Sequence, residues 1–73
     1  MANFAERIRA LRKEKGLSQE GVGSVIGLKK YAVYSYEKGR ACPDRRGLIA
    51  LADYFNVSMD YLAGRTDNPD INR

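Results

Sequence analysis

The sequence predicts an all-α domain of five short helices, and three observations support this prediction. Apolar residues recur at helical spacing in several segments, as with Phe4, Ile8 and Leu11 near the N-terminus. These segments begin after residues that cap helices, and most of them end at a glycine. No segment longer than a few residues shows the alternation of a β-strand. With 73 residues, the chain makes one small domain, close to the lower limit for folding without disulfides or metals.

The first helix is expected over residues 4–15. Asn3 provides its N-cap, and Glu6 stands three residues later in capping-box position. Arg12 lies at the edge of the apolar stripe of this helix. The other basic side chains of its middle part are expected to lie further round the helix than Arg12 or outside, namely Arg7, Arg9 and Lys13.

The second helix begins after Ser18 and ends at a tight turn at Gly27. Glycine makes such a turn at the least cost, because it has no Cβ. Two further glycines lie inside this helix, and each costs about 0.5–1 kcal/mol relative to alanine. We expect Gly23 to be required by a close approach of the third helix, whereas the sequence offers no reason for Gly21.

The remaining three helices are bounded by similar signals. The third is expected over residues 29–38. The fourth follows Asp44 as its N-cap and ends at Asn56. The fifth follows Ser58 and covers residues 59–63.

The predicted core is formed by apolar side chains on the inner faces of these segments. They are Phe4, Ile8, Leu11, Leu17, Val22, Ile26, Val33, Leu48, Leu51, Phe55, Val57 and Leu62. Tyr36 is expected to join them, while Tyr31 and Tyr34 are expected to lie outside. The folded domain is predicted over residues 1–64. Residues 65–73 contain one apolar residue in nine and are predicted to be a mobile polar tail or a linker.

The net charge of +4 is unevenly distributed along the chain. Residues 1–15 carry five basic and two acidic groups, and residues 29–46 carry six and two. Residues 53–73 carry two basic and four acidic groups. This asymmetry suits a protein that binds a polyanion with one of its surfaces.

The composition argues against several classes of function. The chain has no histidine and one cysteine, Cys42, so we expect no internal disulfide, no metal site and no cofactor. The apolar runs are too short to span a bilayer and no signal peptide is evident, which predicts a cytoplasmic protein without a membrane partner. The glycines of residues 21–27 do not form a dinucleotide fingerprint, and a chain this small has little room for a pocket. We therefore predict neither an enzyme nor a small-molecule ligand.

Residues 19–36 carry the main functional signal, because they form a helix, a turn and a second helix. At about 100° per residue, Val33 and Tyr36 face inward in that second helix. The opposite face has basic, aromatic and hydroxyl side chains and no acid: Lys30, Tyr31, Tyr34, Ser35 and Lys38. Lys29 and Lys30 also stand at the helix N-terminus, where the macrodipole disfavours a cation by about 0.3–1 kcal/mol. An anionic partner turns this cost into a gain.

These residues belong to a longer pattern. It comprises Arg12, Gly16-Leu17, Ser18-Gln19, Gly23, Gly27, Val33, Tyr36-Glu37, Gly39 and the run Asn56-Val57-Ser58-Met59-Asp60-Tyr61-Leu62. The pattern resembles the helix-turn-helix domain of the lambdoid phage repressor, Cro and Xre-like regulators over residues 4 to about 68. This resemblance implies a bacterial or phage regulator with a five-helix lambda-repressor-like fold.

The resemblance also implies roles for individual residues. The third helix is expected to lie in the major groove of double-stranded DNA, with helix 2 across the backbone. Base contacts are then implied for Lys30, Tyr31, Tyr34 and Ser35. Contacts with phosphates or at the groove edge are implied for Gln19, Lys29, Lys38 and Arg40. A structural ion pair is implied between Arg12 and Glu37, and both lie on the shoulders of their apolar stripes.

Three departures from the family pattern leave the operator sequence open. Lys29 replaces the usual Ser or Thr cap of helix 3, and Arg45 stands where many members have an apolar residue. Tyr31 and Tyr34 replace the more common Gln, Thr or Arg readers.

Two functions remain open from the sequence. The first is a sequence-specific transcriptional regulator, chiefly a repressor, that binds a palindromic operator as a homodimer through residues 59–66. The second is a protein-interaction module, antitoxin-like or an adaptor, that retains the fold. An adaptor has no need of basic and amide side chains around one surface, which favours the first. RNA is less favoured, because its A-form major groove is too narrow to admit a helix.

Overall fold

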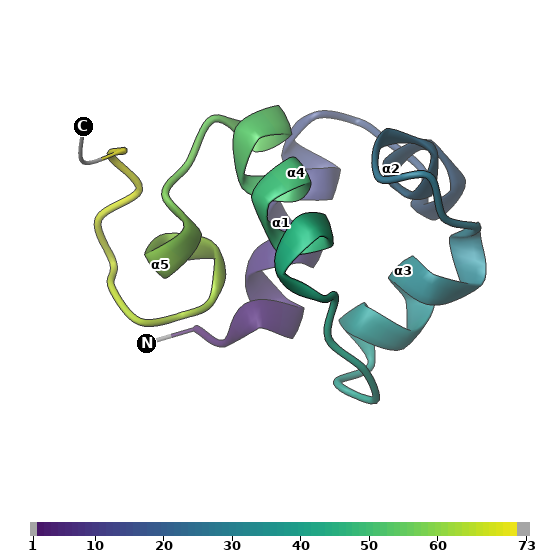
Figure 1. Cartoon of the computed structure of the whole chain (residues 1–73), viewed down its shortest axis with the longest axis horizontal. Coiled ribbons are helices and arrows are strands. Elements are labelled where there is room, and N and C mark those ends of the chain that lie inside the picture. The colour runs from purple at the N-terminus through teal and green to yellow at the C-terminus, as the bar shows by residue number, and fades with distance from the viewer. Residues whose placement is uncertain (1, 72–73) are drawn as a thin grey trace.

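The computed structural model describes residues 2–71, and its regular structure consists of five α-helices (Figure 1). They are α1 (Phe4–Glu14), α2 (Gln19–Val25), α3 (Lys30–Glu37), α4 (Arg45–Phe55) and α5 (Met59–Leu62). No β-strand occurs in the described range. The predicted all-α, five-helix class is confirmed. Helices α3 and α5 are slightly shorter than predicted because Lys29, Lys38 and Ala63 are caps.

Four of the five helices begin with the side-chain cap that the sequence indicates. Asn3 accepts a hydrogen bond from the N–H of the third helical residue within a capping box. Ser18, Asp44 and Ser58 accept the equivalent bond at the start of α2, α4 and α5. Each cap satisfies one of the backbone donors left free at a helix start. Helix α3 differs, because its N-cap Lys29 makes no side-chain hydrogen bond.

The helices surround one core. Helices α2 and α3 lie at one end of the molecule, α5 and both termini lie at the other, and α1 and α4 lie between them (Figure 1). The buried apolar residues are Ile8, Val22, Val33, Tyr36, Leu51, Ala52, Phe55, Val57 and Leu62. Every residue of the predicted core is either in this cluster or packed against it.

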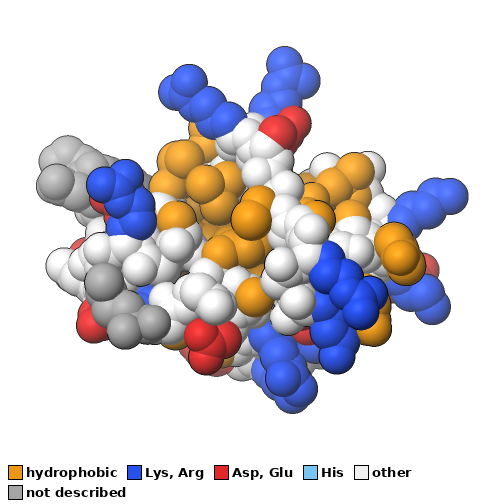
Figure 2. Space-filling model, turned by 90° about the horizontal axis from the view of Figure 1, so that it is seen from below, with side chains coloured by type: hydrophobic (Ala, Val, Ile, Leu, Met, Phe, Trp, Pro, Cys, Tyr) orange, Lys and Arg blue, Asp and Glu red, His pale blue; other side chains and the backbone are white. Residues whose placement is uncertain are grey.

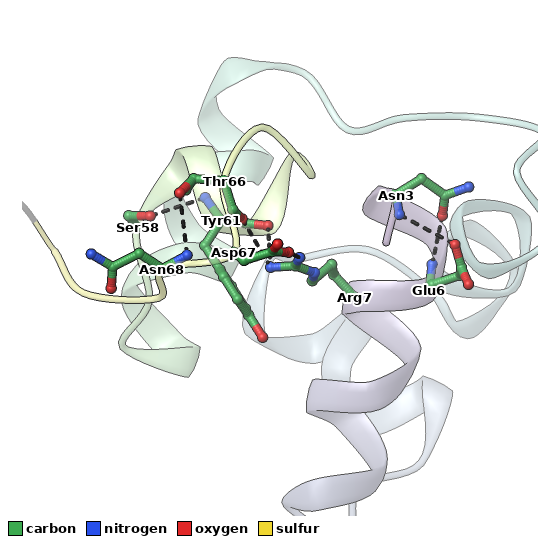
Figure 3. Close-up of polar contacts among 8 residues, drawn as sticks. All are labelled: Asn3, Glu6, Arg7, Ser58, Tyr61, Thr66, Asp67 and Asn68. Carbon is green, nitrogen blue, oxygen red and sulfur yellow. Dashed lines mark hydrogen bonds and ion pairs between the residues drawn. The ribbon is translucent and has the colours of Figure 1, made fainter. Parts of the chain in front are cut away.

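Arg7 is buried, with 6% of its surface exposed, so the prediction that it lies further round the helix than Arg12 or outside is wrong. Its guanidinium carbon lies 3.8 Å from the centre of the Tyr61 ring. Its nitrogens donate to the carbonyl oxygens of Tyr61 at 3.3 Å and Thr66 at 3.1 Å, and to Oδ1 of Asp67 at 2.8 Å (Figure 3). At about 100° per residue, Arg7 lies about 60° from Phe4, so the helical period already places it at the edge of the apolar stripe. Its partners come from α5 and the segment that follows it.

The segment after α5 folds back against the domain. Besides the contacts of Thr66 and Asp67 with α1, the N–H of Ser58 donates to the carbonyl oxygen of Pro69 at 2.9 Å. Residues 66–69 are thereby joined to both α1 and the start of α5. The division at residue 64, with a tail or linker beyond it, stays a prediction. Residues 72 and 73, the last two of the predicted tail, lie outside the described range.

Candidate nucleic-acid interface

Helices α2 and α3 are held together by buried valines and by a close backbone contact. Val22 of α2 and Val33 of α3 are both fully buried in the core. A Cβ at Gly23 would lie 2.6 Å from the carbonyl oxygen of Leu28, whose N–H donates to the carbonyl of Gly23 at 2.8 Å. The predicted close approach is therefore present. The approaching chain is the turn that leads into α3, which also contains Gly27 with φ at +71°, and not α3 itself.

The face of α3 opposite its buried residues is open to solvent. Lys30 is exposed, and Tyr31 is exposed over 71% of its surface. Tyr34 and Ser35 are half-buried on the same side. The rings of Tyr31 and Tyr34 lie 6.2 Å apart between centroids. The expected position of both tyrosines outside the core is confirmed, since neither belongs to the buried cluster.

Basic side chains flank this face at both ends of α3. Lys29 at the N-cap is exposed, as are Lys38 at the C-cap and Arg40 in the loop that follows. The Lys38 ammonium lies 5.6 Å from the Tyr34 ring centroid, within the range of a cation–π contact. The ion pairs within residues 2–71 involve other basic groups, so these three carry uncompensated positive charge.

The side of the molecule that carries the end of α3 and the following loop shows the same imbalance. In this view, Lys and Arg side chains project at many points around the edge, and Asp and Glu side chains are fewer (Figure 2). Apolar side chains gather in the middle of the face (Figure 2). Such a surface attracts anions over a distance of about one Debye length.

Arg12 and Glu37 link α1 to the end of α3. Arg12 Nε lies 2.6 Å from Glu37 Oε2, and Arg12 Nη2 donates to Oε1 at 3.0 Å. The two side chains are 14% and 6% exposed. Arg12 also donates to the carbonyl oxygen of Leu17 at 2.9 Å, just before α2. The hydrogen bond to Glu37 raises the pKa of the Arg12 guanidinium above its ordinary value, against the effect of burial.

Gln19 takes part in this network, which the sequence does not indicate. Its Nε2 donates to Glu37 Oε1 at 3.4 Å, so α1, α2 and α3 meet at one carboxylate.

Arg9 is not among the site residues predicted from the sequence. It is exposed, as expected, yet it lines a hollow together with Gln19 and Lys38. A spacing of three residues between Arg9 and Arg12 is the available signal, because it places both on one side of α1.

The described residues contain no group of three or more His, Cys, Asp or Glu side chains arranged to hold a metal ion. Cys42 is exposed and carries a free thiol. Among these residues, no helix combines the length and apolar character needed to cross a membrane.

A capped helix, a glycine turn and a second helix with an exposed acid-free face define a helix-turn-helix domain. The chain belongs to the helix-turn-helix family, whose model matches residues 8–62.

Individual relatives agree with this assignment. YobD of Bacillus subtilis, an uncharacterized HTH-type transcriptional regulator, is 37% identical over 67 residues, which cover 92% of this chain and 60% of YobD. The c2 repressor of Salmonella phage P22, in complex with a synthetic operator, has a TM-score of 0.84 at 30% identity, covering 90% of this chain and all of that one. The restriction-modification controller C.AhdI from Aeromonas hydrophila has a TM-score of 0.72 at 32% identity, over 81% of this chain and 89% of that one. The resemblance to phage repressors is thus confirmed. The chain spans 51 to 60% of the length of three Bacillus subtilis relatives.

Proposed function

We propose that this domain binds double-stranded DNA and regulates transcription, with α3 lying in the major groove. The main support for the proposal is the outward face of α3, which is exposed at Lys30 and Tyr31, basic at both ends and free of acidic residues. The B-form major groove is about 12 Å wide and admits one α-helix. The similarity to a repressor in complex with its operator supports this use of the fold.

The proposed base-reading residues are those on the open face of α3. Lys30, in the first turn, has a charge and a length suited to the O6 and N7 acceptors of guanine. Tyr31 and Tyr34 offer a ring edge for a thymine methyl and a hydroxyl for a base or a phosphate. Ser35 completes the set with a small hydroxyl.

Residues at the edge of this face are proposed to bind phosphates and to set the register. Lys29, Lys38 and Arg40 provide the charge, and Gln19 provides an amide at the start of α2. Contacts of this kind fix orientation on the duplex and contribute most of the affinity for any sequence.

We propose that two copies bind a palindromic operator through half-sites about 34 Å apart, as helix-turn-helix dimers do. The proposed dimer surface covers residues 59–66, where Met59 is 38% exposed. Repression then follows from occupation of a promoter. The alternative of a protein-interaction module is disfavoured by the basic residues around α3, which form no ion pair within residues 2–71 and which such a module does not need.

Selection of bound duplexes from a random DNA pool at fixed salt tests the proposal. We expect enrichment of a site with two inverted halves, because each copy presents one α3. A pool that shows no enrichment after several rounds, while the protein remains folded, would overturn sequence-specific DNA binding.

Variants of α3 test the individual roles on the selected site. Lys30→Ala or Tyr34→Ala is expected to cost about 1–3 kcal/mol on the operator and little on random DNA. Lys38→Ala is expected to weaken both alike and to reduce the salt slope by about one. Equal losses on both duplexes for Lys30→Ala would contradict direct base reading by that residue.

A further inference from the structure

A pocket of about 510 Å³ lies between the end of α2, α3 and the start of α4, and none of the residues proposed to meet DNA lines it. Small-molecule sites in proteins have volumes of about 300–1,000 Å³. The apolar part of the lining comes from the end of α2, the turn that follows and the middle of α4, with Val25, Ile26, Leu28 and Ala50. The polar part comes from α3 and the start of α4, with Tyr36, Asp44 and Arg46. We call this space the Tyr36 pocket.

The Tyr36 hydroxyl is the polar group deepest in the core that borders this pocket. Tyr36 is buried, with 6% of its surface exposed, yet its hydroxyl forms no hydrogen bond within residues 2–71. Among these residues, no fully buried side-chain nitrogen or oxygen lacks a partner, so this oxygen must reach open space, and the pocket is the space that Tyr36 lines. A buried tyrosine hydroxyl normally has a hydrogen-bond partner. Here it offers a donor and an acceptor to whatever enters the pocket.

Two opposite charges line the same pocket. Asp44 caps α4 through Oδ1, which accepts from the N–H of Gly47 at 2.8 Å, so that bond leaves Oδ2 free. Arg46 is exposed, and within residues 2–71 neither Asp44 nor Arg46 takes part in an ion pair. Burial raises the pKa of Tyr36, and the Asp44 carboxylate raises it further, which indicates that the hydroxyl and the carboxylate lie near one another.

We infer that the Tyr36 pocket binds a small zwitterion with an apolar side chain, namely a free aliphatic α-amino acid. An ammonium group has three donors, and the oxygens of Tyr36 and Asp44 accept two of them. The planar fork of Arg46 suits a carboxylate. The apolar side chain then covers the apolar lining, which includes Leu28, a residue with 45% of its surface exposed.

Simpler ligands match this lining less well. An anion without an ammonium group faces the Asp44 carboxylate, and a cation without a carboxylate faces Arg46. A wholly apolar molecule removes water from the Tyr36 hydroxyl without replacing its hydrogen bonds. The sequence alone does not indicate such a ligand, because the pocket forms only where three helices meet. The inference does not depend on DNA binding.

Titration of the ¹⁵N-labelled protein with L-leucine, followed by heteronuclear NMR at neutral pH without DNA, tests the inference. We expect saturable shifts of the amide signals of residues that line the pocket, such as Leu28 and Gly47. Isoamylamine lacks the carboxylate of leucine, and 4-methylpentanoate lacks its ammonium group. Each should bind about tenfold more weakly than leucine, because each leaves one charged side chain without its partner.

Variants of the protein assign the contacts. Tyr36→Phe keeps the ring in the core and removes the hydroxyl, and Asp44→Asn keeps a residue type that caps helices while removing the charge. These two variants and Arg46→Gln should each weaken leucine binding by about tenfold. Arg45→Gln is the matched control, because Arg45 is an exposed neighbour that does not line the pocket, and it should keep the wild-type affinity.

Three results of these titrations would overturn the inference: shifts that rise with leucine without saturating, equal affinities for leucine and its two analogues, and a wild-type affinity for Arg46→Gln. Pocket signals that move when the free protein is diluted would show that a second copy covers this face, and would overturn it as well. Operator binding, measured separately, decides the proposed function whatever these titrations give.

Discussion

Arg7→Ala is expected to lower the free energy of unfolding by about 3–5 kcal/mol, because the Arg7 side chain joins α1 to α5 and to the segment after it. The guanidinium makes two hydrogen bonds to main-chain carbonyls, at 3.1 and 3.3 Å. A hydrogen bond to a charged group contributes about 1.5 kcal/mol at the lower end of its range, and the stack on Tyr61 adds about 0.5–2 kcal/mol. A domain of this size has a total stability of about 4–11 kcal/mol, so the change is large.

The matched control is Asp67→Ala, which removes the carboxylate but leaves both carbonyl bonds. The Asp67 side chain is 74% exposed, and an exposed ion pair is worth about 0.2–1 kcal/mol. Its melting temperature should fall by about 1–8 °C, whereas that of Arg7→Ala should fall by more than about 12 °C. Arg7→Lys should be intermediate, since an ammonium keeps the charge but cannot bind three oxygens with a planar fork.

Thermal and urea unfolding followed by circular dichroism at neutral pH measures these differences. We expect a clear order of stability, with Asp67→Ala closest to the wild type and Arg7→Ala furthest from it. Equal melting temperatures for the two alanine variants would show that the ion pair alone holds this arginine. An unchanged melting temperature for Arg7→Ala would refute a stabilising role for its carbonyl contacts.

Three further changes test the interior of the domain. Arg12→Ala should lower the free energy of unfolding by about 3–5 kcal/mol, because Glu37 is left as an unpaired buried charge; an unchanged urea midpoint would exclude this role. Gly21→Ala should stabilise α2 by about 0.5–1 kcal/mol, since a Cβ there meets nothing closer than 3.4 Å, whereas Gly23→Ala should destabilise it by about 1–3 kcal/mol because of the 2.6 Å clash. Burial raises the pKa of Tyr36 in the folded state above its ordinary value of about 10. The stability that this shift contributes is therefore present below about pH 10 and is lost as the pH rises through the folded-state pKa. In urea titrations above about pH 9, Tyr36→Phe should therefore lose stability less steeply with pH than the wild type does.

The sequence was sufficient for features that depend on residues a few positions apart. Caps such as Asn3 and Ser58 act on backbone groups within their own first turn, so the helix starts follow from local chemistry. The inward positions of Val33 and Tyr36 follow from the period of the helix. The open, acid-free face of α3 follows from the same period, because what does not face the core faces solvent.

Only the tertiary structure decided where segments distant in sequence meet. The period of α1 places Arg7 at the edge of the apolar stripe, but its partners are Tyr61, Thr66 and Asp67, which the sequence of α1 does not indicate. Gln19 turns toward Glu37, and Arg9 reaches the hollow beside them, because three helices converge at one carboxylate. Local periodicity fixes which way a side chain leaves its own helix. The partner that it finds there depends on how the whole chain closes around the core.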